Sequence, residues 1–200
     1  DFIQAVNDAY EREESKAAKD AMAQILINSR MCATGHRPIC QDTGIVTVFV
    51  RVGMDVQWGN ATMNVTDMIN EGVRRAYLLP DNILRASILA DPDGKRENTK
   101  DNTPAVIHYD IVQGDTVDIQ VAAKGGGSEA KSKFAMLNPS DSVVDWVLEQ
   151  LPKMGAGWCP PGMLGIGIGG TAEKAMIMAK ESLMGSIDIN ELKARGASNR

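Results

Sequence analysis

The chain has 200 residues, of which 44% are hydrophobic and 24% are charged, and its formal net charge is −5. This length and balance fit one globular domain, or one large and one small domain, and exclude a disordered tail or a collagen-like repeat. The acidic balance argues against nucleic-acid binding, and no stretch approaches the roughly 20 apolar residues of a membrane span. An odd count of three cysteines argues against a disulfide framework and for a reducing compartment.

The first fifty residues predict two helices, a turn-rich segment and a strand. Apolar residues recur at helical spacing over 1–13 and 15–31, and turn-forming residues fill 32–44. Residues 45–52 form a run of β-branched residues that predicts a strand. Because this strand is apolar nearly throughout, we expect it to be buried on both faces. The chain begins at Asp1 inside a helical pattern, which indicates a piece of a longer protein.

The middle of the chain predicts further helix and a charged loop. Thr66 is the expected N-cap of a helix over 67–79, with Asp67 in the first turn, facing the positive end of the helix dipole. A shorter helical piece is expected over 81–89, and the charged residues of 91–102 indicate a loop.

The last half of the chain combines strands with helices. Two strands over 105–112 and 116–124, joined by a short loop containing Gly114, predict a hairpin. The residues 139–141 are expected to cap a helix, and 164–184 read as a strand, a glycine turn and a helix. This order predicts an α/β domain, or an α+β one, with a mixed sheet and flanking helices.

The cysteines and histidines differ in their settings. Cys40 and Cys159 lie in loops beside proline and glycine, whereas Cys32 ends a helix. A cysteine is often only a small buried hydrophobe, and we favour that interpretation for Cys32. For the two loop cysteines we favour ligation, because soft thiolates suit iron–sulfur clusters or zinc. His36 and His108 are too few and too separated for a histidine metal site, and we expect His108 to be an ordinary sheet residue.

Glycine-rich and charged segments offer sites for an anion. The turn at 125–128 can present backbone amides to an anion, or it is simply a flexible turn. The segment 165–171 has the look of a dinucleotide fingerprint, but close packing of a strand on a helix explains it better. Arg85 either reaches the surface or binds an anionic ligand, and the residues alone favour the surface. Gln41 and Asp42 can orient a substrate, with turn stabilisation as the alternative for Asp42.

Six motifs together carry a family resemblance. In chain order they are RPICQDTG, LRAS, KDNTPAVIH, AAKGGGSE, WCPPG and GIGGTAEKA. In this order the motifs resemble the amino-terminal half of class I fumarate hydratase, the iron–sulfur fumarase family, which is itself similar to L(+)-tartrate dehydratase. The resemblance covers nearly the whole chain, and six motifs in one order are highly specific.

The resemblance implies a cofactor. Family members hold a [4Fe–4S] cluster with three cysteines, which leaves one iron open as a Lewis acid. Cys40 and Cys159 match two of these ligands, and the third is expected beyond Arg200. Cys32 matches no family ligand. An open cluster of this kind is expected to be sensitive to oxygen.

The resemblance also implies substrate-binding residues. The pair Gln41 and Asp42 matches family residues at the substrate, and Gly127 matches the substrate-side glycine turn. Arg85 matches an arginine that binds a substrate carboxylate, so this reading replaces the surface interpretation. The family's proton-transfer residue and further cationic clamps lie in its carboxy-terminal part, so no catalytic residue is expected within 1–200.

These implications predict that residues 1–200 are the amino-terminal domain of a hydro-lyase that interconverts fumarate and (S)-malate. The fragment alone is expected to be inactive and to hold no stable cluster. The implied partners are the dicarboxylate substrate, the carboxy-terminal part of the enzyme and a second copy in a homodimer, with no nucleic acid or membrane. The resemblance places such an enzyme in the tricarboxylic acid cycle, in the cytoplasm or, in a eukaryote, the mitochondrion. The alternatives are L(+)-tartrate dehydration, a non-catalytic anion-binding module and, more distantly, a nicotinamide dehydrogenase.

Overall fold

The computed structural model forms two compact units. It describes residues 2–40, 42–158, 162–185 and 188–196. The first unit joins Asp1–Ile39 to Met163–Arg200, and the second is Cys40–Gly162. None of the helices within the described ranges is long and apolar enough to cross a membrane.

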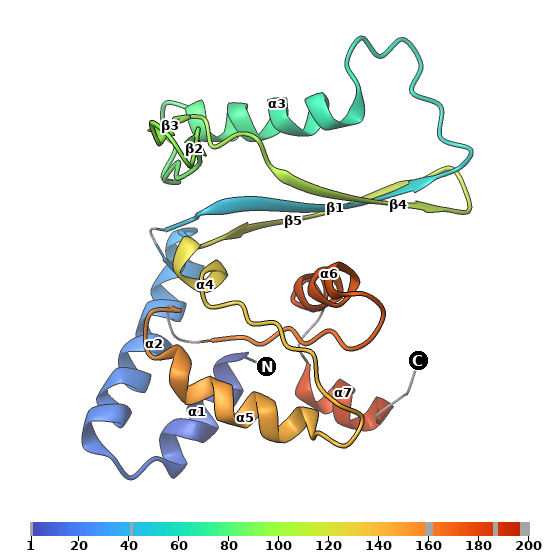
Figure 1. Ribbon diagram of the computed structural model, residues 1–200. Helices are drawn as coiled ribbons and strands as arrows, with labels where there is room; N and C mark the ends of the chain where they lie inside the picture. Colours follow the sequence, from blue (N-terminus) through green and yellow to red (C-terminus); the bar gives the residue numbers. More distant parts are fainter. Residues whose placement is uncertain (1, 41, 159–161, 186–187, 197–200) are drawn as a thin grey trace. The chain divides into compact units, whose positions relative to one another are not determined.

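The first unit is helical. Its helices are α1 (Phe2–Arg12), α2 (Lys16–Gly35), α6 (Ala172–Ser182) and α7 (Ile189–Arg195) (Figure 1). The two helices predicted at the amino-terminal end are therefore confirmed. The α2 helix runs four residues further than expected, and His36 ends it in the left-handed conformation. Ser15 caps the start of α2, because its side chain accepts a hydrogen bond from the Ala18 amide.

The glycine-rich segment before α6 packs against that helix. A Cβ atom at Gly165 would lie 1.9 Å from the Ala179 carbonyl oxygen, and one at Gly167 would lie 2.0 Å from that of Ala175. This confirms the expected close packing, which only glycine permits. The strand predicted at the start of 164–184 is wrong, because the segment lies against a helix and not against another strand.

The second unit is built on a mixed three-stranded sheet in the order β4-β1-β5 (Figure 1). The strands are β1 (Ile45–Gly53), β4 (Val106–Val112) and β5 (Val117–Lys124). The central strand β1 is parallel to β4 and antiparallel to β5. The predicted mixed sheet with flanking helices is confirmed, and the α/β class with it.

The hairpin predicted for β4 and β5 is wrong, because β1 lies between these strands. Residues 46–50 of β1 are all buried, as expected, so this strand takes the centre of the sheet. The short connection at Gly114 crosses the end of β1 instead of closing a hairpin. There the Asp55 amide donates to the Gly114 carbonyl oxygen and the Gly53 amide to that of Thr116.

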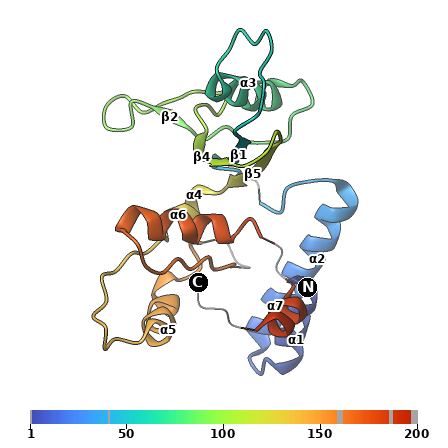
Figure 2. The same cartoon turned by 90° about the vertical axis from the view of Figure 1, so that its right-hand side faces the viewer.

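The helix α3 (Val65–Leu78) covers one face of the sheet (Figure 2). The core between them contains five buried residues, namely Val46, Val48, Val50, Val73 and Tyr77. Asn64 and not Thr66 is the N-cap, because the Asn64 side chain accepts a hydrogen bond from the Asp67 amide at 2.9 Å. The Thr66 hydroxyl instead pairs with that of Tyr109.

The segment predicted as a short helix over 81–89 is extended up to β2 (Leu89–Ala90), which pairs with β3 (Glu97–Asn98) inside the charged loop. Asparagine side chains explain the difference. Asn82 accepts a hydrogen bond from the Leu84 amide, and Asn102 accepts from two amides further along. These amides therefore have side-chain acceptors in place of the carbonyl groups of a helix.

Two helices complete the second unit. The glycine turn closes into the one-turn helix α4 (Gly126–Glu129). The α5 helix (Val143–Met154) is capped by Ser142, one residue after the expected cap.

The topology brings four motifs to one end of the sheet. Ile45 at the start of β1 pairs with Lys124 at the end of β5, and β4 begins beside Thr47. The α3 helix returns to the same end, where Tyr77 meets Thr43. The loops before β1 and β4, and those after β5 and α3, are therefore neighbours.

Candidate functional site

Asp42 joins the loop before β1 to the glycine turn after β5. One carboxylate oxygen accepts a hydrogen bond from the Gly44 amide and the other accepts from the Gly126 amide, each at 3.0 Å. Gly44 has a φ of 49°, and a Cβ atom there would lie 2.0 Å from the Lys124 carbonyl oxygen. The two motifs can therefore approach this closely only with glycine at position 44.

Thr43 joins the same loop to the segment that carries Arg85. Its hydroxyl donates to the Arg85 carbonyl oxygen at 3.0 Å and accepts a hydrogen bond from the Tyr77 hydroxyl at 3.2 Å. The Thr43 residue is only 4% exposed. The backbone of Arg85 is thus held directly beside the loop that begins at Cys40.

Asn102 makes a second connection between these segments, and sequence reasoning missed it. Its side-chain oxygen accepts from the amides of Ser87 and Ile88 at 2.7 and 3.1 Å. Its side-chain nitrogen donates to the Gly44 carbonyl oxygen at 2.9 Å. The only signal in the sequence was its place in the motif KDNTPAVIH.

The glycine turn also contacts the segment that precedes Cys159. The Ser128 hydroxyl donates to the Trp158 carbonyl oxygen at 2.9 Å. Lys124 and Glu129 form an ion pair across the turn at 3.5 Å. The amide of Gly126 already has the Asp42 carboxylate as acceptor. One amide of the turn, that of Gly126, therefore binds one of the protein's own carboxylates.

The expected site residues differ in how far the structure places them. Cys40 is partly exposed in the loop before β1, and Arg85 is exposed. Within the described ranges, no carboxylate pairs with the Arg85 guanidinium. Gly127 lies within α4. Gln41 and Cys159 lie outside the described residues.

The other cysteine and the histidines have ordinary structural settings. The Cys32 thiol, in α2, donates to the Pro38 carbonyl oxygen at 3.3 Å. His108 stacks on Phe49 within the sheet, with ring centroids 4.9 Å apart, as expected for a sheet residue. His36 is an exposed helix-ending residue.

Among the described residues, the expected metal ligands are represented by Cys40 alone. No group of three histidine, cysteine, aspartate or glutamate side chains among them could hold a metal ion. The Cys40 thiol has the soft donor chemistry that suits an iron–sulfur cluster. One thiol of this kind can supply a single ligand to such a cluster, so the described residues alone do not make a complete ligand set.

A cluster of charged side chains surrounds Asp101, the residue before Asn102. The Thr103 amide and hydroxyl donate to the Asp101 carboxylate at 3.0 and 2.8 Å, and Arg74 donates to it at 3.1 Å. The Thr103 amide is the main reason that the pKa of Asp101 lies below its usual range, followed by the Thr103 hydroxyl and Arg74. Arg75 and Arg74 likewise lower the pKa of Glu71. This cluster anchors the residue before Asn102 to α3.

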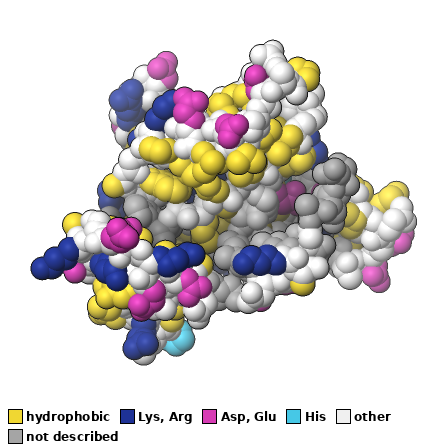
Figure 3. Space-filling model, turned by 90° about the horizontal axis from the view of Figure 1, so that it is seen from below, with side chains coloured by type: hydrophobic (Ala, Val, Ile, Leu, Met, Phe, Trp, Pro, Cys, Tyr) yellow, Lys and Arg dark blue, Asp and Glu magenta, His cyan; other side chains and the backbone are white. Residues whose placement is uncertain are grey.

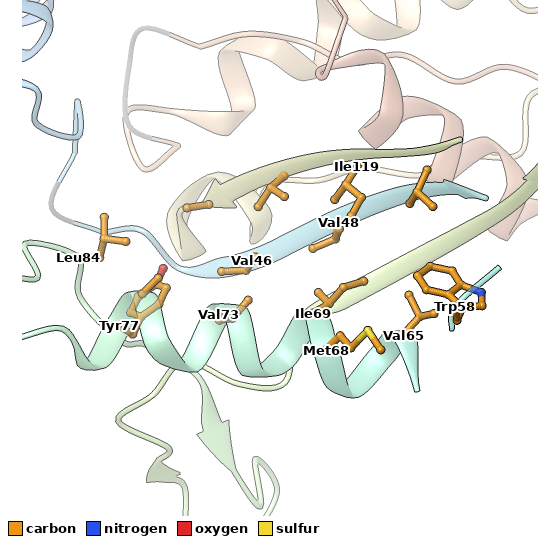
Figure 4. A pocket seen from close by; sticks show the side chains of 15 residues that line it. Val46, Val48, Trp58, Val65, Met68, Ile69, Val73, Tyr77, Leu84 and Ile119 are labelled. Carbon is orange, nitrogen blue, oxygen red and sulfur yellow. The ribbon is translucent and has the colours of Figure 1, made fainter. Parts of the chain in front are cut away.

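An apolar groove of about 590 Å³ lies between α3 and β5. Figure 4 shows Trp58 at one end of the groove and Tyr77 with Leu84 at the other. None of its lining residues carries a charge, so it is no site for a dicarboxylate. Apolar side chains also gather between scattered charges on the face in Figure 3.

Several known proteins are similar to this chain, among them the following three. A "Putative L(+)-tartrate dehydratase subunit alpha" of Methanocaldococcus jannaschii is 34% identical over 195 residues, which are 94% of this chain and 67% of that protein. "Fumarate hydratase class I, anaerobic" of Escherichia coli K12 is 32% identical over 82% of this chain and 30% of its own length. The "L(+)-tartrate dehydratase subunit alpha" of Escherichia coli O157:H7 is 25% identical over 92% of this chain and 61% of its own length.

The chain thus spans between about one third and two thirds of the length of these relatives. The sequence profile of the family described as "Fumarate hydratase (Fumerase)" matches residues 1–198. With this match over nearly every residue and the 34% identity to the archaeal relative, the chain belongs to the fumarate hydratase family.

Proposed function

We propose that the complete enzyme containing this chain is a hydro-lyase that reversibly hydrates fumarate to (S)-malate and carries a [4Fe–4S] cluster with one open iron. One observation supports this most strongly. The loops that carry Cys40, Arg85 and the glycine turn are tied together through Asp42 and Thr43 at one end of the sheet. Family membership supports the same reaction class.

In this proposal the residues of the chain have different roles. Cys40 and Cys159 would hold the cluster, with a third cysteine beyond residue 200. The bound cluster supplies a Lewis acid for water or for the hydroxyl of malate. The planar Arg85 guanidinium is suited to pair with a substrate carboxylate through two parallel hydrogen bonds.

Asp42 has two roles in this proposal. Both of its oxygens accept hydrogen bonds from backbone amides, so it fixes the glycine turn, including Gly127, beside the segment before β1. Each oxygen keeps a second lone pair, which can accept a hydrogen bond from the hydroxyl of a bound hydroxy acid. The orienting and turn-stabilising functions weighed for Asp42 are thus compatible.

A second candidate reaction is the dehydration of L(+)-tartrate. It is favoured by the names of two relatives, each called an alpha subunit of an L(+)-tartrate dehydratase. The chemistry is of the same kind, because a hydroxyl next to a carboxylate leaves with a proton from the neighbouring carbon. A non-catalytic anion-binding module is the alternative from another class.

The same relatives suggest what the chain works with. Two of them are named as subunits. We propose that a further segment or subunit supplies the third cysteine, the proton-transfer residue and the remaining cationic groups, and that the enzyme is a homodimer of such assemblies. As a fumarase it would act in the tricarboxylic acid cycle, in the cytoplasm or in a eukaryote's mitochondrion.

The test is an assay of the complete enzyme after anaerobic reconstitution with iron and sulfide. We expect turnover of fumarate, L(+)-tartrate or both, and loss of that turnover on iron chelation or prolonged exposure to air. Comparison of kcat/KM for the two substrates decides between the two reactions. The fragment 1–200 alone is expected to show no turnover and to retain no stable cluster. Undiminished turnover after chelation, full activity of the fragment, or activity on neither substrate would contradict the proposal.

A further inference from the structure

We propose that Asn102 is a positioning residue that sets the Arg85 guanidinium relative to the Cys40–Gly44 loop. The inference rests on the proposed function for the carboxylate-binding role of Arg85. Among the described residues, Asn102 forms hydrogen bonds with neither Cys40 nor the Arg85 residue itself. It acts through the backbone on either side of the site.

The contacts of Asn102 connect two segments that are far apart in the chain. It binds the Ser87 and Ile88 amides, 15 and 14 residues away, and the Gly44 carbonyl, 58 residues away. The side chain is 0% exposed, so water cannot replace a bond that is lost. The segment that follows Arg85 is therefore locked to the end of the loop that begins at Cys40.

The segment around Arg85 depends on such contacts, because residues 82–88 belong to no helix or strand. Three side chains from outside it hold the stretch from Arg85 to Ile88. Thr43 binds the Arg85 carbonyl, Asn98 binds the Ala86 carbonyl at 2.9 Å, and Asn102 binds the next two amides. Thr43 belongs to the Cys40–Gly44 loop and Asn102 binds its last residue, whereas Asn98 is exposed and binds no residue of that loop.

The backbone conformation at position 102 allows aspartate or glycine to replace asparagine with little strain. Asn102 has a φ of 57°, a left-handed conformation that asparagine, aspartate and glycine adopt at little cost. Asn102→Asp keeps the shape and the acceptor for the two amides. It replaces the donor with an oxygen facing the Gly44 carbonyl oxygen, so it breaks the connection to the loop. It also places a carboxylate in a buried site, which is why the double-mutant cycle below is needed.

The experiment compares N102D with N98D in the complete enzyme. Both variants make the same chemical change and lose a donor to a backbone carbonyl, but only N102D loses a contact with the Cys40–Gly44 loop. We expect N102D to weaken the binding of succinate, a non-reacting dicarboxylate, and to raise KM by about tenfold with a smaller change in kcat. We expect N98D to change both by less than about threefold.

A double-mutant cycle with Arg85→Ala separates positioning from a general structural effect. If Asn102 acts through Arg85, N102D should weaken succinate binding far less in the R85A enzyme than in the wild type. Fully additive losses, or wild-type succinate affinity in N102D, would overturn the inference. Should N102D fail to fold, Asn102→Gly keeps the left-handed backbone and enters the same cycle.

Succinate binding also keeps the two proposals distinguishable. An enzyme that turns over neither fumarate nor L(+)-tartrate, yet binds succinate through Arg85 and Asn102, would refute the reaction and support the inference. An active enzyme in which N102D binds succinate normally would support the reaction and refute the inference.

Discussion

The second unit buries two very different regions. Beneath α3, Val48 is 0% exposed in a wholly apolar core. At the adjoining end of the sheet, Asn102 is also 0% exposed but is held by three directional hydrogen bonds. Apolar packing is non-directional and sets stability, whereas hydrogen bonds fix particular atoms relative to one another. The comparison therefore assigns stability to the apolar face and site geometry to the polar end.

Tyr77 belongs to both regions. Its ring is part of the apolar core, and its hydroxyl donates to Thr43 at the polar end. Thr43 in turn donates to the Arg85 carbonyl. The Tyr77 side chain thus joins α3 to Thr43 of the candidate site, which makes the separation of the two regions testable.

The largest effect is expected from Arg85→Ala, at the polar end. Loss of a paired carboxylate contact should lower kcat/KM of the complete enzyme by about 100-fold, equivalent to about 3 kcal/mol. Stability should hardly change, because Arg85 is exposed. Arg85→Lys, which keeps the charge without the planar pair of donors, should fall between. Wild-type kcat/KM in R85A would break the assignment of this end to carboxylate binding.

A smaller effect, on stability alone, is expected from Val48→Ala on the apolar face. Removing two buried methyl groups should lower the free energy of unfolding by about 2 kcal/mol. The kcat/KM of the folded enzyme should stay within about twofold. Val121→Ala is the control, since this side chain lies on β5 and is 62% exposed. Urea denaturation measures both, and an equal loss in the two variants would contradict the packing account.

Tyr77→Phe should affect both stability and substrate binding, because it removes only the hydroxyl that joins the two regions. We expect a loss of about 1 kcal/mol in stability, together with a several-fold rise in KM. Tyr109→Phe is the matched control, because its hydroxyl pairs with Thr66 at an exposed position. A rise in KM of the same size in Y109F would contradict a specific role for the hydrogen bond between Tyr77 and Thr43.

The smallest effect concerns acid stability at Asp101. Its pKa is lowered in the folded chain, mainly by the Thr103 amide. The resulting stabilisation is present above the unfolded pKa, about 3.9, and is lost as the pH falls through the lower folded value. Urea midpoints measured from pH 5 to pH 2 should therefore fall in the wild type, and fall less steeply in D101N. Identical slopes in the wild type and in D101N would contradict this prediction. Both proteins keep some dependence of stability on pH, because the pKa of Glu71 is also lowered.

The apolar region was the easier to predict from sequence. The unbroken β-branched run of β1 predicts a strand buried on both faces, and residues 46–50 confirm it. The sequence predicts the cap of α3 two residues too late, because Asn64 and Thr66 are both good cap residues and only the geometry chooses between them. Gly114 marks a hairpin locally, but the more buried β1 displaces that pairing.

The polar end could be predicted only in part. Cys40, Asp42 and Arg85 stand out by their motifs, whereas the way in which Thr43 and Asn102 join those motifs depends on contacts across 42 and 58 residues. No local pattern encodes such contacts, because asparagine in a charged loop reads as a turn residue.

Iron content tests the central claim most directly, in the complete enzyme with Cys40→Ser and, as its control, Cys32→Ser. Both substitutions exchange one sulfur for oxygen, but only Cys40 lies at the end of the sheet where the motifs meet, whereas the Cys32 thiol donates to a carbonyl in the first unit. After anaerobic reconstitution we expect C40S to lose most of its cluster iron and its dicarboxylate turnover, and C32S to keep both. Wild-type iron content and turnover in C40S would contradict the account.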